Sequence, residues 1–309
     1  MSVLPTAVIA AALALTAADD SDEAGTWNFR TEKPVKVTLL AGSIGAYQGG
    51  NYGSQLAGVC ENIELKNISK TGAGAFPLKK HFKQQVLENW TLNVRSREDE
   101  NWLVLHASVN SIATPLSTNH HLKNIIVLAK MAGMKVAFLS PQPWGRDGNS
   151  KFNGLDGLQR RDSTQLVTDF VMGRLTARQA LGDYADKRPD GADAAWVDLE
   201  KPDVRIDIYD SPLRNKGAEL RDLEKMKALL LKDRSWVKEH ADMSEAQRDA
   251  WLLTDAQRAA EVPRWFMRPE LHAFDHIHPN AEGHLIIAQT ACPSLPKSWG
   301  CDCAALGKE

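Results

Sequence analysis

The sequence predicts an α/β fold in which a parallel sheet is covered by helices on both faces, giving three layers. Short, nearly continuous apolar runs alternate along the chain with longer segments of helical periodicity, and such runs are typical of parallel strands buried on both faces. The chain has 309 residues and is 43% hydrophobic, which suffices for one substantial core. In this fold class the active centre is expected at the carboxyl ends of the strands.

The individual elements follow from these periodicities. The apolar runs predict strands at residues 35–41, 63–68, 102–107, 135–140 and 204–209. A proline opens the first predicted helix, where its missing N–H costs nothing, and Leu78, Phe82 and Val86 then share one face. Helical spacing predicts helices at residues 77–90, 119–131, 162–174, 176–184, 216–231 and 244–260, and an apolar, helix-like stretch follows residue 281.

A long charged segment, residues 145–269, interrupts the alternation of strands and helices. Only residues 204–209 within it have the pattern of a strand. We therefore expect one domain, residues 27–309, that carries this segment as a helical insertion or cap. Its charges are expected to form a solvated face.

Charge and hydropathy exclude two classes of partner. The net charge of -2 leaves no basic footprint for nucleic acid. No apolar stretch of about 20 residues occurs beyond the N-terminus, so no membrane span is expected.

The N-terminus has the features of an export signal. Residues 8–18 (VIAAALALTAA) form a short apolar core that ends in small residues, and acidic residues follow at once. We expect residues 1–18 to be a signal peptide, cleaved after Ala18, and the mature protein to be secreted or periplasmic. No Lys or Arg precedes the apolar core, and a buried N-terminal helix is the alternative.

Four cysteines, an even number, fit an oxidising compartment. Three of them lie near the C-terminus, where Cys292 paired with Cys301 or Cys303 could fix the tail; Cys60 lies far upstream. A zinc site is disfavoured because the chain has no Cys-x-x-Cys pair. The pairing of the cysteines stays open.

A carboxylate and a histidine three residues apart, Asp275 and His278, lie where a loop enters the last apolar stretch. An Asp that orients a His and supports its imidazolium is half of a hydrolytic triad. The candidate nucleophile is Ser43, which follows the first apolar run and Gly42. Ser, Asp and His then stand in the chain order of an α/β hydrolase, although triads recur on unrelated folds.

Four short blocks at the predicted strand ends carry a family resemblance. They are residues 41–44 (AGSI), 67–72 (NISKTG), 108–111 (SVNS) and 275–279 (DHIHP). In the same order, they resemble Gly-Asp-Ser-Leu or Ile, Asn followed five residues later by Gly, Gly-x-Asn-Asp, and Asp-x-x-His-Pro. These are the blocks of the SGNH hydrolases, also called the GDSL esterase and lipase family. The resemblance implies a flavodoxin-like α/β/α fold.

The resemblance also implies a role for each block. Ser43 would be the nucleophile, His278 the general base and acid, and Asp275 the residue that orients His278. The family stabilises the oxyanion with the backbone N–H of the nucleophile, a backbone N–H at the second-block Gly, and an Asn side chain. These correspond to Ser43, Gly72 and Asn110. No cofactor or metal is implied, and the expected substrate is a small-molecule or glycan ester.

The blocks depart from the family pattern at four positions. Ala41 and Gly42 replace the first-block Gly and Asp, and Ser108 and Ser111 replace the third-block Gly and Asp. None of these residues is the nucleophile, the base or an oxyanion donor, so the chemistry can survive their replacement.

Two alternatives remain open. His272, His276, His278 and His284 cluster in the sequence and, with Asp275 and His120 or His121, could serve a metal-dependent hydrolase; prolines at 269 and 279 make this segment a poor continuous helix. A glycan-binding protein that keeps the fold without catalysis is the second alternative.

The substrate is expected to carry an acetyl or other short acyl group, borne on a glycan, because the insertion lacks a long apolar run suited to a lipid surface. Tyr47 and Trp144 follow the ends of the first and fourth predicted strands and are expected to line the pocket. The alternative is that Trp144 packs beneath the insertion and Tyr47 caps the first helix.

Overall fold

The computed structural model describes residues 33–88, 100–107, 109–187, 193, 195–197 and 200–308. The expected signal peptide, residues 1–18, lies outside these ranges, as does Ser108 of the third block.

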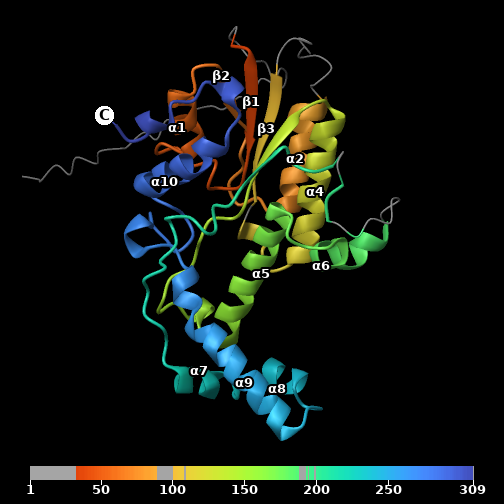
Figure 1. Cartoon of the computed structure of the whole chain (residues 1–309), viewed down its shortest axis with the longest axis vertical. Coiled ribbons are helices and arrows are strands. Elements are labelled where there is room, and N and C mark those ends of the chain that lie inside the picture. Colours follow the sequence, from red (N-terminus) through yellow and green to blue (C-terminus); the bar gives the residue numbers. More distant parts are fainter. Residues whose placement is uncertain are drawn as a thin grey trace, which may run out of the picture.

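The described residues form a five-stranded sheet in the order β2-β1-β3-β4-β5, and every neighbouring pair is parallel (Figure 1). All five predicted strands are present. β5 has 3 residues and is much shorter than the predicted strand at 204–209. The strands are β1 (Val35–Leu40), β2 (Ile63–Asn67), β3 (Glu100–His106), β4 (Lys135–Leu139) and β5 (Val204–Ile206). This is the flavodoxin-like strand order, whose switch point lies between β1 and β3.

Helices cover both faces of the sheet, so the predicted three-layer α/β/α fold is confirmed. One core lies between the sheet and α2, α4 and α5, and a second lies between the sheet and α1 and α10. The α-helices are α1 (Tyr52–Val59), α2 (Ala75–Phe82), α4 (Pro115–Met131), α5 (Gly154–Met172), α6 (Ala177–Leu181), α7 (Leu223–Leu230), α8 (Arg234–Glu239), α9 (Glu245–Ala260) and α10 (Ala281–Ala291).

Several helix ends differ from the expectation. α4 begins at Pro115 and α5 at Gly154, both earlier than predicted. α7 begins later, at Leu223, because the side chain of Asp222 accepts a hydrogen bond from the Lys225 N–H and so caps the helix there. α1 and α8 were not predicted; each is only 8 or 6 residues long and carries a weak periodic signal.

The segment 145–269 divides into two parts. α5 and β5 join the main fold, since Val167, Phe170 and Val171 lie in the core beside α2 and α4. Helices α7, α8 and α9 extend away from the sheet (Figure 1) and, with Leu158 of α5, form a small core of their own around Trp236. We propose that the segment belongs to a single domain, with these three helices as an arm.

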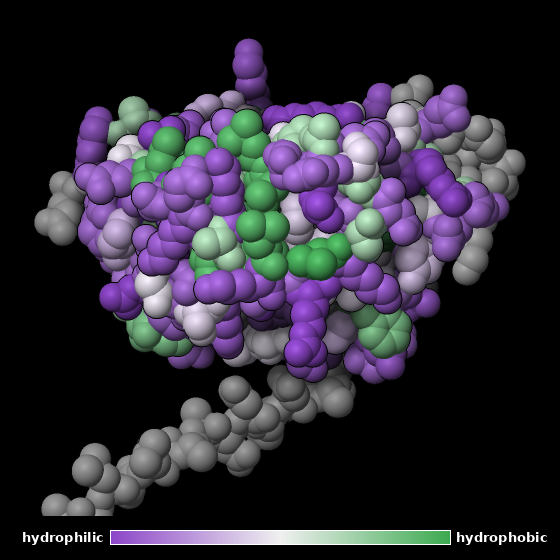
Figure 2. Space-filling model, turned by 90° about the horizontal axis from the view of Figure 1, so that it is seen from below, coloured by the Kyte–Doolittle hydropathy of each residue, from purple (hydrophilic) through white to green (hydrophobic). Residues whose placement is uncertain are grey.

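The face of the molecule at the arm end is mainly hydrophilic, with a strip of apolar side chains across it (Figure 2). Large apolar side chains exposed on the arm are Leu231, Val237, Trp251 and Leu253. Apolar atoms contribute much of the surface of an ordinary folded protein. Within the described ranges, no helix is both long enough and apolar enough to cross a membrane.

Two disulfides fix the C-terminal tail, Cys60–Cys301 and Cys292–Cys303. The tail also pairs through its backbone with the residues that follow α1, because Asn62 donates to the Trp299 carbonyl at 3.1 Å. Trp299 is fully buried and packs edge-on against Trp102 of β3. Two disulfides are consistent with an oxidising compartment.

Candidate active site

Ser43 lies in a tight turn at the carboxyl end of β1, beside the switch point of the sheet. The carbonyl of Gly42 accepts hydrogen bonds from Gly45 at 3.1 Å and Ala46 at 3.3 Å, which closes the turn. A Cβ atom on Gly45 would collide with the side chains of Ser69 and Ala41. The close approach of the second-block loop therefore requires glycine at position 45.

His278 lies in a closely hydrogen-bonded loop between the 3₁₀ turn Pro269–Leu271 and α10. Its carbonyl accepts from Ala273 at 2.9 Å, and the His276 carbonyl accepts from Gly145 at 2.7 Å. Asn280 then caps α10, its side chain accepting from Gly283 at 2.9 Å. These bonds fix the backbone that carries His278.

Ser43, His278 and Asp275 form one hydrogen-bonded chain. His278 Nε2 lies 2.8 Å from Ser43 Oγ, and His278 Nδ1 lies 2.8 Å from Asp275 Oδ2. The side chains of His278 and Asp275 are 17% and 28% exposed, so substrate and water can reach them. This is the geometry that a serine nucleophile and its base require.

Asp275 remains ionised although it is partly buried. Burial alone would raise its pKa, but the backbone N–H groups of His278 and Ile277 and the ring of His278 donate hydrogen bonds to its carboxylate, and the pKa lies below its ordinary value. An ionised carboxylate at Nδ1 fixes the imidazole tautomer with Nε2 facing Ser43.

The loops that carry Ser43, Gly72 and Asn110 are joined by hydrogen bonds. Ala41 donates to Ser69 Oγ at 3.0 Å and accepts from Lys70 at 2.9 Å, which links the first and second blocks. The side-chain amide of Asn110 donates to the Ala73 carbonyl at 3.3 Å, which links the second and third.

Two of the expected oxyanion donors are free backbone groups. In the described part of the chain, the N–H groups of Ser43 and Gly72 donate no hydrogen bond to a protein atom. Gly72 has φ of 72°, a conformation that L side chains rarely adopt. We propose that these N–H groups and the Asn110 amide stabilise the oxyanion.

Two residues to which the sequence assigned no role, Asn67 and Ser111, hold this arrangement. Asn67 of β2 donates to the Gly45 carbonyl at 2.7 Å and accepts from the Ser69 N–H at 3.0 Å. Ser111 Oγ accepts from Ala75 at the start of α2 at 3.1 Å. Their positions in the blocks were visible in the sequence, but their partners were not.

An aromatic stack connects the turn that carries Ser43 with α10. The ring of Tyr47 stacks on His284 of α10 at 4.7 Å, and Tyr52 of α1 lies near-parallel to His284 at 6.2 Å. The phenol of Tyr52 also contacts His106 Nδ1 at 3.2 Å. Tyr47, expected to line the pocket, is half-buried and contacts α10 through this stack.

Burial keeps two of these histidines neutral. It lowers the pKa of His106 to about 3 and, assisted by nearby His278, that of His284 to about 4. Three of the four histidines proposed as a metal cluster have different surroundings: His276 lies against Phe152, His278 at Ser43 and His284 in the stack. Among the residues that the structure describes, no three His, Cys, Asp or Glu side chains are arranged to hold a metal ion.

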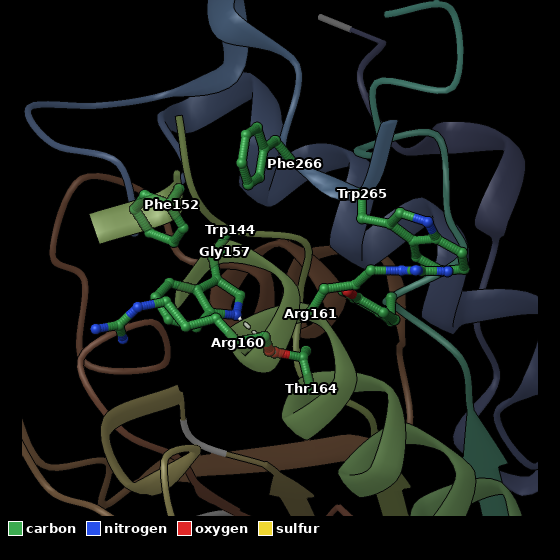
Figure 3. A pocket seen from close by; sticks show the side chains of 9 residues that line it. Trp144, Phe152, Gly157, Arg160, Arg161, Thr164, Trp265 and Phe266 are labelled. Carbon is green, nitrogen blue, oxygen red and sulfur yellow. Dashed lines mark hydrogen bonds between the residues drawn. The ribbon is translucent and has the colours of Figure 1, made fainter. Parts of the chain in front are cut away.

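Trp144 is buried in the core and packs against α5. Figure 3 shows its indole beside Thr164, to which Nε1 donates a hydrogen bond of 3.0 Å, and Phe152 packs edge-on against it at 5.3 Å. The cavity that Trp144 lines together with Arg161 and Trp265 has a volume of only about 10 Å³, about the room of one water molecule. This packing favours a core role for Trp144 over a place in a substrate pocket.

Trp144→Ala is expected to lower the free energy of unfolding by about 3–5 kcal/mol, because it empties a buried aromatic site. Trp144→Phe is expected to cost less, since part of the volume and the contact with Phe152 remain. Urea unfolding gives both values. If Trp144→Ala left stability intact and changed the acyl preference of the protein, Trp144 would belong to the pocket.

Stability is expected to fall as pH decreases from about 6.5 to about 4. The folded pKa values of His106 and His284 are depressed to about 3 and about 4, whereas the unfolded value is about 6.5. The unfolded chain therefore binds more protons in this window, and each histidine costs about 1.4 kcal/mol per pH unit at most. His284→Phe keeps the ring between the two tyrosines and should flatten the slope in urea unfolding. An unchanged slope would contradict this account.

Comparisons with known proteins found similar solved structures at low sequence identity. No family model and no curated protein sequence matches the chain. A lipolytic protein of the G-D-S-L family from Veillonella parvula is similar at 15% identity over 84% of this chain and 97% of that chain, with a TM-score of 0.42. A putative acylhydrolase from Bacteroides fragilis is similar at 14% identity over 90% and 93%, with a TM-score of 0.46. An acetylxylan esterase from Geobacillus stearothermophilus is similar at 10% identity over 87% and 95%, with a TM-score of 0.41. The solved structures that this chain resembles over most of its length thus include GDSL-type lipolytic proteins and an acetylxylan esterase, at low sequence identity.

Proposed function

We propose that this protein is an exported serine esterase that hydrolyses carboxylic esters through an acyl-enzyme. The observation that carries the proposal is the chain of two 2.8 Å hydrogen bonds from Ser43 through His278 to Asp275. It joins the end of β1 to the loop before α10, and it has the geometry of an activated serine.

The first half of the reaction forms the acyl-enzyme. Ser43 Oγ attacks the ester carbonyl while His278 Nε2 accepts its proton, and Asp275 stabilises the resulting imidazolium. The N–H groups of Ser43 and Gly72 and the amide of Asn110 donate to the oxyanion. When the tetrahedral intermediate collapses, His278 returns the proton to the leaving alcohol oxygen.

The second half regenerates the enzyme. Water attacks the acyl carbon, His278 accepts a proton from it, and the same donors stabilise the second oxyanion. Collapse breaks the bond to Ser43 Oγ, which takes the proton from His278, and the carboxylic acid leaves.

The polar residues that line a cavity near the third block support a short acyl ester on a glycan. The cavity has a volume of about 370 Å³, within the usual range for small-molecule sites. Its walls offer carboxylate, amide, guanidinium and hydroxyl groups, which suit the hydroxyls of a sugar better than a long acyl chain. The lining residues are Ile112, Ala113, Asp156, Gln159, Arg160, Asp162 and Ser163.

The cavity is close in the chain to the catalytic groups. Ile112 and Ala113 follow the 3₁₀ turn Val109–Ser111 that contains Asn110. Asp156, Gln159, Arg160 and Ser163 recur on α5 at helical spacing and share one face. We infer that part of a polar substrate binds between this face of α5 and the third block.

Export is supported by the disulfides and by the N-terminal sequence. Both disulfides fasten the C-terminal tail, and stable disulfides are typical of secreted and periplasmic proteins. We propose that residues 1–18 direct export and that the mature protein acts outside the cytoplasm.

Ser43→Ala is expected to reduce hydrolysis of short-chain p-nitrophenyl esters by about 10⁴-fold or more, because it removes the nucleophile. The melting temperature should change little, since Ser43 is only partly buried. Ser235→Ala, an exposed serine on the arm, is the matched control and should retain full activity. Equal activity of wild type and Ser43→Ala would rule out the proposed nucleophile. Glycan binding without hydrolysis by the wild type would favour the binding-protein alternative.

Asn110→Ala is expected to lower kcat by about 10²- to 10³-fold with little change in KM, because an oxyanion donor acts mainly in the transition state. Asn110 is exposed, so the folded state should persist, which a thermal melt checks. A rise in KM with unchanged kcat would assign Asn110 to ground-state binding instead.

A further inference from the structure

An exposed aromatic ring lies directly on the catalytic histidine. Phe274 stacks on the imidazole of His278 with ring centroids 4.9 Å apart and an interplanar angle of 21°. Phe274 is 77% exposed. It is among the most exposed of the large apolar residues that the structure describes. One face of the ring therefore covers His278, and the rest is open to solvent.

The loop around Phe274 is fixed by its own hydrogen bonds. Asp275 Oδ1 accepts from the backbone N–H groups of Ile277 and His278 at 2.7 and 2.8 Å. Gln142 Nε2 donates to the Ile277 carbonyl at 3.3 Å, and Ala273 donates to the His278 carbonyl. Phe274 thus projects from a backbone held on both sides, which preorganises the ring for binding.

The proposed reaction determines which part of the substrate lies near this ring. His278 Nε2 must come within hydrogen-bond distance of the leaving alcohol oxygen to return the proton. The carbonyl oxygen lies instead towards the donors Ser43, Gly72 and Asn110. The alcohol is therefore the substrate part that approaches the imidazole, and Phe274 lies next to it.

A flat apolar ring suits one class of alcohol. A pyranose presents a face of C–H groups that can stack on an aromatic ring, while its hydroxyls remain free for polar groups. A simple small alcohol has no such face. The cavity along α5 offers polar groups that can bind sugar hydroxyls, but no aromatic residue lines it.

We infer that Phe274 is a specificity-determining residue that binds the pyranose ring of the leaving alcohol by stacking, so that the preferred substrates are esters of sugars. This inference rests on the proposed esterase function.

The test compares two acetate esters that differ only in the alcohol. Monoacetylated methyl xylopyranoside carries a pyranose ring, and ethyl acetate does not. Phe274→Ala is expected to lower kcat/KM for the xylopyranoside ester about 5- to 10-fold, mainly through KM, and to change kcat/KM for ethyl acetate less than about 2-fold. Phe274→Tyr keeps the ring and should restore the wild-type values.

Met131→Ala is the matched control, because Met131 is also 77% exposed but lies at the end of α4 that leads into β4, opposite the catalytic edge. It should leave both substrates unaffected. In addition, methyl xylopyranoside should inhibit ethyl acetate hydrolysis competitively, and its inhibition constant should rise in Phe274→Ala by a similar factor.

Other outcomes overturn the inference in distinguishable ways. An equal loss on both esters would mean that Phe274 positions His278 and does not contact the alcohol. No loss on either ester would mean that the ring does not contact the substrate. If the wild type hydrolysed neither ester nor any p-nitrophenyl ester, the proposed esterase function itself would fail.

Discussion

The central position of β1 is the constraint on which the rest of the structure depends. All six of its residues, Val35–Leu40, are buried, with β2 on one side, β3 on the other and a helical layer over each face. A strand buried on both faces cannot shift register without disrupting the packing of both cores. The turn that follows it, with Ser43, is therefore held at the switch point of the sheet, where three strand-end loops converge.

Burial and hydrogen bonding set the charge of each ionisable group in and around the candidate site. His106 and His284 lie in the interior and stay neutral because burial lowers their pKa values to about 3 and about 4. Asp275 stays ionised because backbone N–H groups donate to it. His278 lies between these environments, partly exposed and joined to both Asp275 and Ser43. The proposed base is thus placed where water can reach it, and the buried histidines of the interior are uncharged.

The aromatic residues near the site show how position in the fold determines their roles. Tyr47 and Phe274 lie within a few residues of the first and last blocks, and Trp144 follows the end of β4. Trp144 is enclosed by α5 and Phe152, and Tyr47 stacks on His284. Phe274 alone of these three has most of its surface in solvent. Proximity in the sequence did not distinguish them, because exposure depends on which helix packs over each ring.

The arrangement of strands was predictable from local pattern. Apolar runs of strand length located all five strands, and their alternation with helices indicated a parallel sheet with three layers. The candidate triad was also readable, because Ser43 and the pair Asp275 and His278 follow strand-end and loop signals that need no distant information. Helix ends were less certain, since a single cap such as Asp222 of α7 decides where a helix starts.

Contacts between distant segments were decided by the tertiary structure alone. The pairing of Cys60 with Cys301 spans 241 residues, and the fit of Gly45 against Ser69, the stack of Tyr47 on His284 and the ring of Phe274 on His278 depend equally on packing. The sequence by itself determined which residues are apolar, which can react and where the chain turns, because these are local properties of side chains and backbone. Only the tertiary structure decided which of them meet, since that depends on how the two helical layers close over the sheet and which surfaces they leave in water.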